Sequence, residues 1–305
     1  MVIDSHCHWL PEEIIANAHF FSKAWGDMES GLVSMSACGI DAALLTYPSS
    51  DAHLKLGGYA EAAGIFNKNI SLLVKKYPGK IIGAAVLPVG DKNAMADEVR
   101  RAREEYGLSA VSLSSSYDGR FLDDAMFEPA YRAAAKTGMP VFVHSQTVNP
   151  VGSERVSDPL LTPVVEYVFD ITLCIGRMLM SGMLREYAQE IKFVFANFAG
   201  AVPYLAARFD DTYNMLRGLN FVKDLGSEPT ARLRNIYVDT GGERDSGNFL
   251  PALRFFGPGR LLWGSDWPAK KDAALSLQAV KNLGLARTQE EGILGGNAAS
   301  ILGIR

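Results

Sequence analysis

The sequence predicts a single-domain α/β protein, residues 1–305, built as a (β/α)8 TIM barrel. Eight short apolar runs alternate with segments whose apolar residues recur at helical spacing. Such alternation is typical of a parallel sheet covered by helices, and eight units in roughly 250–300 residues match the size of a closed barrel. The chain has no linker rich in proline, glycine or serine. The alternative is an open doubly wound sheet, but that fold usually has a glycine-rich turn after its first strand.

The predicted strands share a core of aliphatic and aromatic residues. In chain order they begin near residues 2, 42, 81, 110, 140, 191, 235 and 260. The segments that follow them show helical spacing, and those at 59–77 and 124–138 end at a proline or a glycine. We expect helices within residues 11–23, 32–38, 59–77, 93–106, 124–138, 164–187, 203–219, 248–256, 272–282 and 288–302. Polar loops are expected at 114–119 and 145–163, and the longer one is placed to act as a lid over a site.

The composition excludes several classes of function. The net charge is −4, the hydrophobic content is 48%, and charges of both signs are mixed along the chain. This pattern offers no basic surface for nucleic acid or for a membrane, and no apolar run approaches the ~18 residues of a transmembrane helix. The cysteines, Cys7, Cys38 and Cys174, are scattered and odd in number. We therefore expect no disulfide framework and a cytoplasmic location.

The first strand carries an unusual pair of residues, His6 and His8. Side chains alternate between the two faces of a strand, so these imidazoles point the same way while Cys7 points to the opposite side and packs in the core. Two imidazoles at this spacing can chelate one divalent metal ion. Asp4 shares their face, where it is expected either to orient an imidazole or to join an ion pair inside the barrel.

Other strands also end in residues that suit a metal site. Active sites of β/α barrels lie at the carboxyl ends of the strands. His144 ends the fifth predicted strand, Asn197 follows the sixth, and Asp266 follows the eighth. Three imidazoles and a carboxylate suit Zn²⁺ or a similar divalent ion. Of the remaining histidines, His19 is expected at the surface, and His53 either lines the same mouth or lies outside it.

Several motifs resemble the amidohydrolase superfamily, in particular the branch that includes aminocarboxymuconate semialdehyde decarboxylase. The matching segments, in the family's order along the whole chain, are Ile3-Asp-Ser-His-Cys-His8, Pro140-Val-Phe-Val-His144, residues 170–182, residues 191–208, Leu262-Trp-Gly-Ser-Asp-Trp-Pro268 and residues 293–299. The resemblance implies one metal ion held by His6, His8, His144 and Asp266. It also makes a homodimer plausible.

One position departs from the family pattern. The family usually has a histidine after strand six, where this chain has Asn197. In the decarboxylase relatives that histidine holds the metal-bound water and assists proton transfer. An asparagine amide forms hydrogen bonds but does not change charge between pH 5 and 8. Proton transfer then falls to Asp266 or to a group that the sequence does not identify.

The predicted activity is metal-dependent hydrolysis of a small carboxylated, cyclic or aromatic metabolite. A metal-activated water would attack, Asp266 would act as general base, and Asn197 would orient the water or an oxyanion. The first alternative is a non-oxidative decarboxylase, and the second is a catalytically impaired barrel with a binding role, which Asn197 motivates.

Substrate contacts are expected from aromatic and basic residues near the strand ends. Trp9, Phe198 and Trp267 flank the predicted ligands, where they either form an apolar wall for a flat substrate or plug the barrel mouth. Decarboxylation would favour an arginine that pairs with the carboxylate through both nitrogens. The candidates for that role are Arg120, Arg177 and Arg208.

Overall fold

The barrel predicted from the sequence is confirmed in the computed structural model, which describes residues 1–17, 21–48, 56–155 and 158–304. Eight strands form one sheet in chain order, and every adjacent pair is parallel. The strands are β1 Ile3–His8, β2 Ala42–Thr46, β3 Ile81–Val86, β4 Ala110–Ser114, β7 Val141–His144, β8 Phe193–Phe195, β9 Tyr237–Asp239 and β10 Leu261–Leu262. Each begins within three residues of its predicted position.

The two edges of the sheet meet through the segment that follows β10. The backbone nitrogen of Ser5 donates to the carbonyl of Trp263 at 3.0 Å, and that of Asp266 donates to the carbonyl of His6 at 2.8 Å. An isolated parallel bridge joins Cys7 to Trp267. These contacts close most of the ring, so the residues that follow β10 lie directly beside β1.

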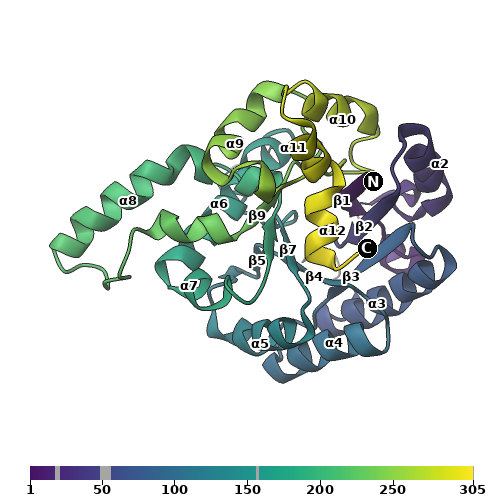
Figure 1. Cartoon of the computed structure of the whole chain (residues 1–305). Coiled ribbons are helices and arrows are strands. Elements are labelled where there is room, and N and C mark those ends of the chain that lie inside the picture. Colours follow the sequence, from purple (N-terminus) through teal and green to yellow (C-terminus); the bar gives the residue numbers. More distant parts are fainter. Residues whose placement is uncertain (18–20, 49–55, 156–157, 305) are drawn as a thin grey trace.

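Helices surround the ring of strands (Figure 1). They are α1 Glu12–Asn17, α2 Met28–Cys38, α3 Tyr59–Lys76, α4 Lys92–Glu104, α5 Glu128–Thr137, α6 Tyr167–Met180, α7 Met183–Tyr187, α8 Val202–Gly218, α9 Leu250–Phe256, α10 Ala273–Lys281, α11 Arg287–Glu291 and α12 Asn297–Leu302. Local sequence explains their ends. For example, Asp91 caps the start of α4 by accepting from two backbone amides, and Gly138 ends α5 in the left-handed conformation at φ 68°.

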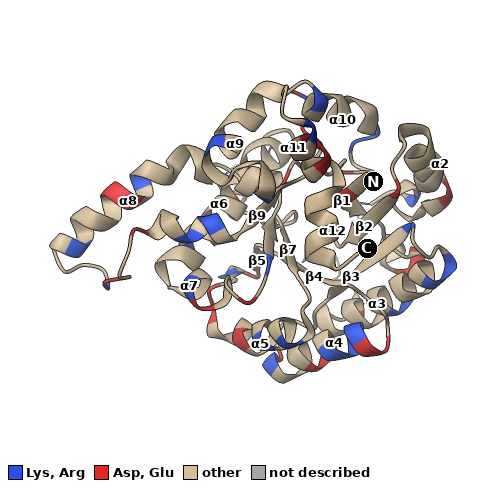
Figure 2. Ribbon diagram, in the orientation of Figure 1, with Lys and Arg blue, Asp and Glu red and all other residues tan. Residues whose placement is uncertain are grey.

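The helices carry most of the charge, and charges of both signs lie side by side on α4, α5 and α8 (Figure 2). None of the helices among the described residues is long and apolar enough to cross a membrane.

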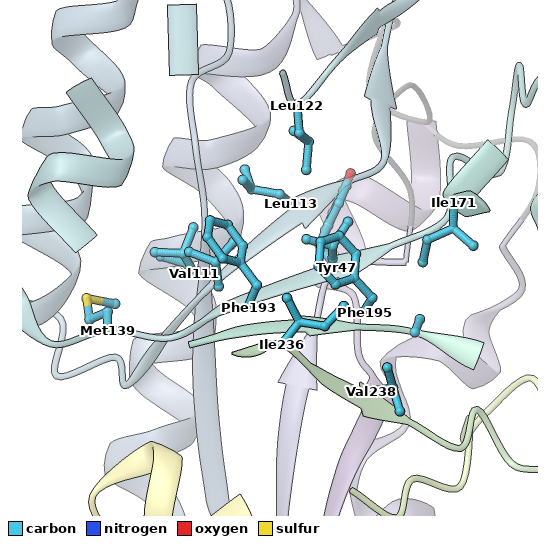
Figure 3. Packing of buried hydrophobic residues seen from close by; sticks show 14 of the residues in the cluster. Tyr47, Val111, Leu113, Leu122, Met139, Ile171, Phe193, Phe195, Ile236 and Val238 are labelled. Carbon is cyan, nitrogen blue, oxygen red and sulfur yellow. The ribbon is translucent and has the colours of Figure 1, made fainter. Parts of the chain in front are cut away.

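Two apolar layers hold the barrel together. The outer layer lies between strands and helices, where Phe195 and Val238 lie on the side of Ile171 of α6 and Val111 lies beside Phe193 (Figure 3). The inner layer fills the amino-terminal end of the barrel with residues such as Ile3 and Leu44, and α12 packs against it. The inside of the barrel is thus closed at one end, which leaves the carboxyl ends of the strands to form a site.

The structure differs from the sequence prediction in three places. The expected polar loop at 114–119 contains a hairpin of β5 Ser116–Tyr117 and β6 Arg120–Phe121. Its turn is Asp118-Gly119, and both residues have positive φ. An Asp-Gly pair is a recognised two-residue hairpin signal, so the local sequence explains this difference.

The other two differences are irregular turns within predicted helices. The expected helix 164–187 consists of η4 Thr162–Glu166, which is a π-helical turn, followed by α6 and α7. The expected helix 288–302 consists of α11, η9 Gly292–Gly296 and α12. A Cβ at Gly295 would lie 2.4 Å from the carbonyl oxygen of Met1, so this turn allows the close approach of the amino terminus.

Candidate metal centre

Three imidazoles meet at the carboxyl ends of β1 and β7. His6 and His8 lie on β1, and His144 is the last residue of β7. Their ring centroids are 4.9 to 5.1 Å apart, and one ligand nitrogen of each lies within 4.8 Å of the others. The structure thus brings together three of the four ligands predicted from the sequence.

Each imidazole is held through its Nδ1 atom. His6 Nδ1 lies 2.8 Å from a carboxylate oxygen of Asp239, and His144 Nδ1 lies 2.9 Å from the carbonyl oxygen of Ser145. His8 Nδ1 lies 3.3 Å from the carbonyl oxygen of Thr46. A carbonyl only accepts hydrogen bonds, so Nδ1 carries the hydrogen in His144. In the neutral ring the Nε2 lone pair is then available to a metal ion. His8 Nδ1 also lies 3.1 Å from the Thr46 hydroxyl, which can donate or accept.

The donor set fits a divalent metal ion. His6 Nε2 is fully buried and has no hydrogen-bond partner. A buried nitrogen without a partner is costly, and a metal ion would satisfy it. Imidazole nitrogens with a carboxylate are the usual ligands of borderline ions such as Zn²⁺. The residues present therefore fit the metal that the motifs imply.

Asp266, the fourth predicted ligand, lies against the same imidazoles. Its Oδ1 atom is 3.6 Å from His6 Nε2 and 3.5 Å from His8 Nε2, and its Oδ2 atom is 3.6 Å from Lys270 Nζ. The backbone of Asp266 has φ 62° and is tied to His6 by the hydrogen bond that closes the barrel. Asp266 therefore faces the metal position on one side and a lysine on the other.

Charges around the imidazoles set their protonation in the metal-free protein. Burial lowers the pKa of His6, but the carboxylate of Asp239 outweighs this effect and raises the pKa to about 9. Burial lowers the pKa of His8 and holds that of His144 well below its usual value. For Asp266, burial raises the pKa, but contact with His8 and the charge of His6 lower it to about 2. In the metal-free protein His6 is therefore protonated at neutral pH, and a metal ion would take the place of this proton beside the carboxylate of Asp266.

Asp239, at the end of β9, holds the His6 ring through Nδ1, and the sequence analysis missed this contact. Asp4 was considered as a residue that orients an imidazole, but its carboxylate instead accepts from the backbone nitrogen of Ser265 at 2.9 Å. Its other carboxylate oxygen accepts from the Ser265 hydroxyl, so Asp4 ties β1 to the segment that follows β10. The rule that found the other residues, a polar side chain at a strand end, would also have found Asp239.

Asn197 lies in a left-handed turn at the end of β8. Asn197, Phe198 and Ala199 have φ of 52°, 57° and 64°. This backbone costs roughly 1–2 kcal/mol for each residue with a side chain, so the surrounding contacts must hold it. The Asn197 backbone nitrogen donates to Asp239 at 3.2 Å, and a Cβ at Gly241 would lie 1.8 Å from Asn197 Oδ1. The turn and the glycine together place the Asn197 amide at the site.

A cavity of about 760 Å³ opens onto the metal position, bordered by His8, His144 and Asp266. This volume is typical of a small-molecule site. Its walls include aliphatic, polar and aromatic residues, and the aromatic residues are Phe21, Trp25, Tyr167 and Phe198. Trp25 also stacks on the His8 ring with centroids 5.9 Å apart. A flat, apolar ring with polar substituents is therefore a good match for this space.

Of the predicted substrate contacts, Phe198 lines the cavity, whereas Trp9 and Trp267 lie outside its wall. Trp9 donates its indole hydrogen to the carbonyl of Gly26, and Trp267 packs close to Gly31 of α2. The directions of these two indole rings are set by packing against Gly26 and Gly31. Their nearness in sequence to the predicted ligands does not reveal these contacts.

The predicted arginines do not line the cavity either. Arg177 forms a two-pronged ion pair with Asp123, with distances of 2.8 and 3.0 Å, and Arg120 lies on the exposed β6. Arg208 borders a separate groove on α8. Among the described residues of the cavity wall, Lys270 is the one lysine or arginine. No sequence motif indicated it.

The ends of the predicted lid, residues 145–163, border the cavity through Thr147 and Pro163. The Tyr167 hydroxyl donates to the Thr147 carbonyl at 3.0 Å, and the Val151 backbone nitrogen donates to Asp170 at 3.0 Å. These bonds fasten the segment to α6, and its movement as a lid stays a prediction. His19 and His53 lie outside the described residues.

Comparisons with known proteins agree with this architecture. A family model described as Amidohydrolase matches residues 3–304. A 2-amino-3-carboxymuconate-6-semialdehyde decarboxylase from Dictyostelium discoideum is 26% identical over 246 residues, which cover 80% of this chain and 67% of that protein.

Solved structures share the fold. A 5-carboxyvanillate decarboxylase from Sphingomonas paucimobilis superposes with a TM-score of 0.86 at 18% identity, covering 100% of this chain and 99% of that one. A dihydroxybenzoic acid decarboxylase from Polaromonas sp., described with bound manganese and an inhibitor, superposes with a TM-score of 0.83 at 19% identity, covering 99% of this chain and 96% of that one.

Proposed function

Because this chain belongs to the amidohydrolase family of enzymes, we propose that it is a metal-dependent decarboxylase of a small aromatic or unsaturated carboxylic acid. The observation that carries the proposal is that imidazoles and a carboxylate converge at one wall of a cavity that also has four aromatic residues in its lining. The relatives named above are decarboxylases, which supports this reaction over the hydrolysis expected from the sequence.

His6, His8, His144 and Asp266 would hold one divalent metal ion. When bound, such an ion supplies positive charge that polarises substrate oxygens and stabilises developing negative charge. The ligand types favour Zn²⁺, whereas the manganese named for the Polaromonas protein makes Mn²⁺ the second candidate. Asp239 holds the His6 ring through Nδ1, which would leave Nε2 for the ion.

Decarboxylation breaks the bond between the ring carbon and the carboxylate, and a proton replaces the carbon dioxide that leaves. Asp266 is the group that would carry this proton. Its carboxylate is ionised at neutral pH because its pKa lies near 2 in the metal-free protein. It therefore begins as a base, takes a proton from a substrate hydroxyl or water, and returns it to the carbon.

The remaining cavity residues would position the substrate. The Asn197 amide donates to or accepts from a substrate oxygen without changing charge. Trp25, Tyr167 and Phe198 offer ring faces and edges to a flat substrate and exclude water from the reacting carbon.

The test is a substrate panel with protein reconstituted with Zn²⁺ or Mn²⁺, scored in isotopically labelled water. The panel includes hydroxybenzoates such as 2,6-dihydroxybenzoate, together with lactones and amides of similar acids. We expect release of carbon dioxide and entry of deuterium at the ring carbon, with no oxygen from water in the product. Labelled oxygen without carbon dioxide would instead establish hydrolysis. Absence of any turnover would support the impaired barrel with a binding role that Asn197 suggested.

The expected homodimer and cytoplasmic location stay predictions. Light scattering of the purified protein would test the dimer, since a mass near 66 kDa is twice the chain mass of 33.1 kDa.

A further inference from the structure

We propose that Lys270 binds the anionic group of the substrate and makes the cavity selective for acids over neutral analogues. This inference rests on the proposed function, because it concerns the same cavity. It assigns the carboxylate-binding role that the sequence analysis gave to arginines, and it places that role on a segment that no motif marked.

Acidic side chains outnumber lysines and arginines around the described part of the cavity wall. Lys270 is the one lysine or arginine among its described lining residues, whereas Asp266 and Glu243 contribute carboxylates to the same wall. Glu243 already accepts hydrogen bonds from the backbone of Arg244 and Asp245 and from the side chain of Asn248. An entering anion would meet these two carboxylates, and within the described wall Lys270 is the side chain that can offset their repulsion.

Lys270 is held in place by hydrogen bonds and by packing of its stem. Its backbone nitrogen donates to the carbonyl of Asp266 at 2.8 Å, and its Nζ donates to the carbonyl of Gly241 at 2.6 Å. Its aliphatic stem runs close to Gly242, where a Cβ would lie 2.8 Å from Lys270 Cδ. A lysine fixed by its backbone, its stem and its ammonium loses less entropy on binding a ligand than a free surface lysine does.

The Lys270 ammonium keeps an N–H group that can donate to a ligand. A lysine ammonium has three hydrogens. One goes to Gly241, and the nearest carboxylate oxygen, Asp266 Oδ2, is 3.6 Å away, beyond an ordinary hydrogen bond. The Lys270 side chain is 41% exposed. At least one N–H is therefore available to a carboxylate or phenolate in the cavity.

Lys270 and the imidazoles lie on opposite sides of the Asp266 carboxylate. Asp266 Oδ1 faces the imidazoles and Oδ2 faces Lys270. A flat aromatic acid whose carboxylate contacts Lys270 would place its ring in the cavity and another oxygen substituent toward the metal position, on the far side of Asp266. The ligand class that fits is a flat aromatic acid with a second polar substituent.

The test measures binding to the metal-loaded protein by calorimetry, with benzoate and its neutral isostere benzamide as probes. The variants are Lys270→Met, which removes the charge, and Lys270→Arg, which keeps it. Lys271→Met is the matched control on the neighbouring, exposed lysine. The metal ion attracts benzoate equally in all variants, so differences between them report on the side chain.

We expect Lys270→Met to weaken benzoate binding about 10- to 100-fold, which is typical of a lost hydrogen bond to a charged group, and to leave benzamide binding within twofold. Lys270→Arg should retain most of the benzoate affinity, and Lys271→Met should match the wild type. Equal weakening of both probes would show a structural role and overturn the inference. So would unchanged benzoate binding in Lys270→Met, or wild-type protein that does not distinguish benzoate from benzamide.

This result is independent of turnover. Selective, Lys270-dependent binding of benzoate in a protein that releases no carbon dioxide would contradict the proposed function and leave this inference standing. Decarboxylation by a protein whose benzoate affinity does not depend on Lys270 would support the proposed function and overturn this inference.

Discussion

The two ends of the barrel differ in what their strands bury. At the amino-terminal end, apolar side chains such as Ile3, Leu44 and Val194 pack together and against Ile301 of α12. At the carboxyl-terminal end, the same strands bury imidazoles and carboxylates, and the backbone after them takes left-handed conformations at Asn197 and Asp266. A closed apolar end stabilises the ring, and this allows strained and polar groups to be held at the other end.

This comparison predicts that substitutions at the two ends change different quantities. At the carboxyl end, activity and metal affinity should change while the fold persists. At the amino end, the free energy of unfolding should change while the chemistry of the folded protein persists.

The largest expected effect is on turnover, from Asp266→Asn. The amide keeps the shape of the side chain but neither carries the proton nor offers an anionic ligand, so we expect decarboxylation to fall about 10²- to 10⁴-fold. Carbon dioxide release and a urea unfolding curve measure the two quantities. Asp97→Asn, at an exposed position on α4, is the control. An Asp266→Asn protein with more than a tenth of the wild-type rate would refute the role of this carboxylate.

At the opposite end, Leu44→Ala should lower the free energy of unfolding by about 2–5 kcal/mol, because it opens a cavity in a fully buried layer. Turnover per folded molecule should stay within twofold. Urea unfolding gives the stability change, and Leu72→Ala, exposed on α3, is the control. If Leu44→Ala also lowered turnover per folded molecule by much more than twofold, stability and activity would not be divided between the two ends of the barrel.

An intermediate effect is expected from Asp239→Asn, which weakens the support of the His6 ring. Residues that orient a ligand histidine are typically worth 10- to 100-fold in metal affinity, so we expect a loss of about that size. Competition with a chromophoric chelator measures it, with Asp211→Asn as an exposed control. Metal affinity within twofold of wild type would show that Asp239 does not orient the ligand.

The smallest expected effect is a pH dependence of stability in the metal-free protein. The folded-state pKa of His6 is raised to about 9 from an ordinary value of 6.5, chiefly by Asp239 acting against burial. Protonation of His6 therefore stabilises the fold at pH below 6.5, and this contribution is lost as pH rises toward 9. Thermal unfolding across this range should show a falling Tm, and Asp239→Asn should flatten the fall. An unchanged slope in that variant would contradict the assignment.

The sequence was sufficient to predict the barrel and the meeting of three imidazoles beside Asp266. Strands such as residues 81–86 are marked by continuous apolar runs, and the strand-end rule then locates His8, His144 and Asp266 without knowledge of packing. The same rule applied to residue 239 would have identified the partner of His6.

The cavity wall was harder to predict, because the direction of a side chain after a strand depends on contacts made elsewhere. Trp9 turns toward Gly26, and Arg177 pairs with Asp123, each through a partner distant in sequence. Lys270 reaches the cavity because Gly242 leaves room for its stem and the Gly241 carbonyl accepts a hydrogen bond from its ammonium. The spacing of residues in the sequence does not indicate that Lys270 contacts these glycines.

The central claim is that three imidazoles and Asp266 hold one divalent ion at the mouth of the barrel. Anomalous X-ray diffraction from crystals of the protein loaded with Zn²⁺ or Mn²⁺ tests it most directly. The account predicts one strong anomalous peak per chain, within bonding distance of the Nε2 atoms of His6, His8 and His144 and of an oxygen of Asp266. A peak bound by other residues, or no peak in crystals grown with the metal, would contradict it.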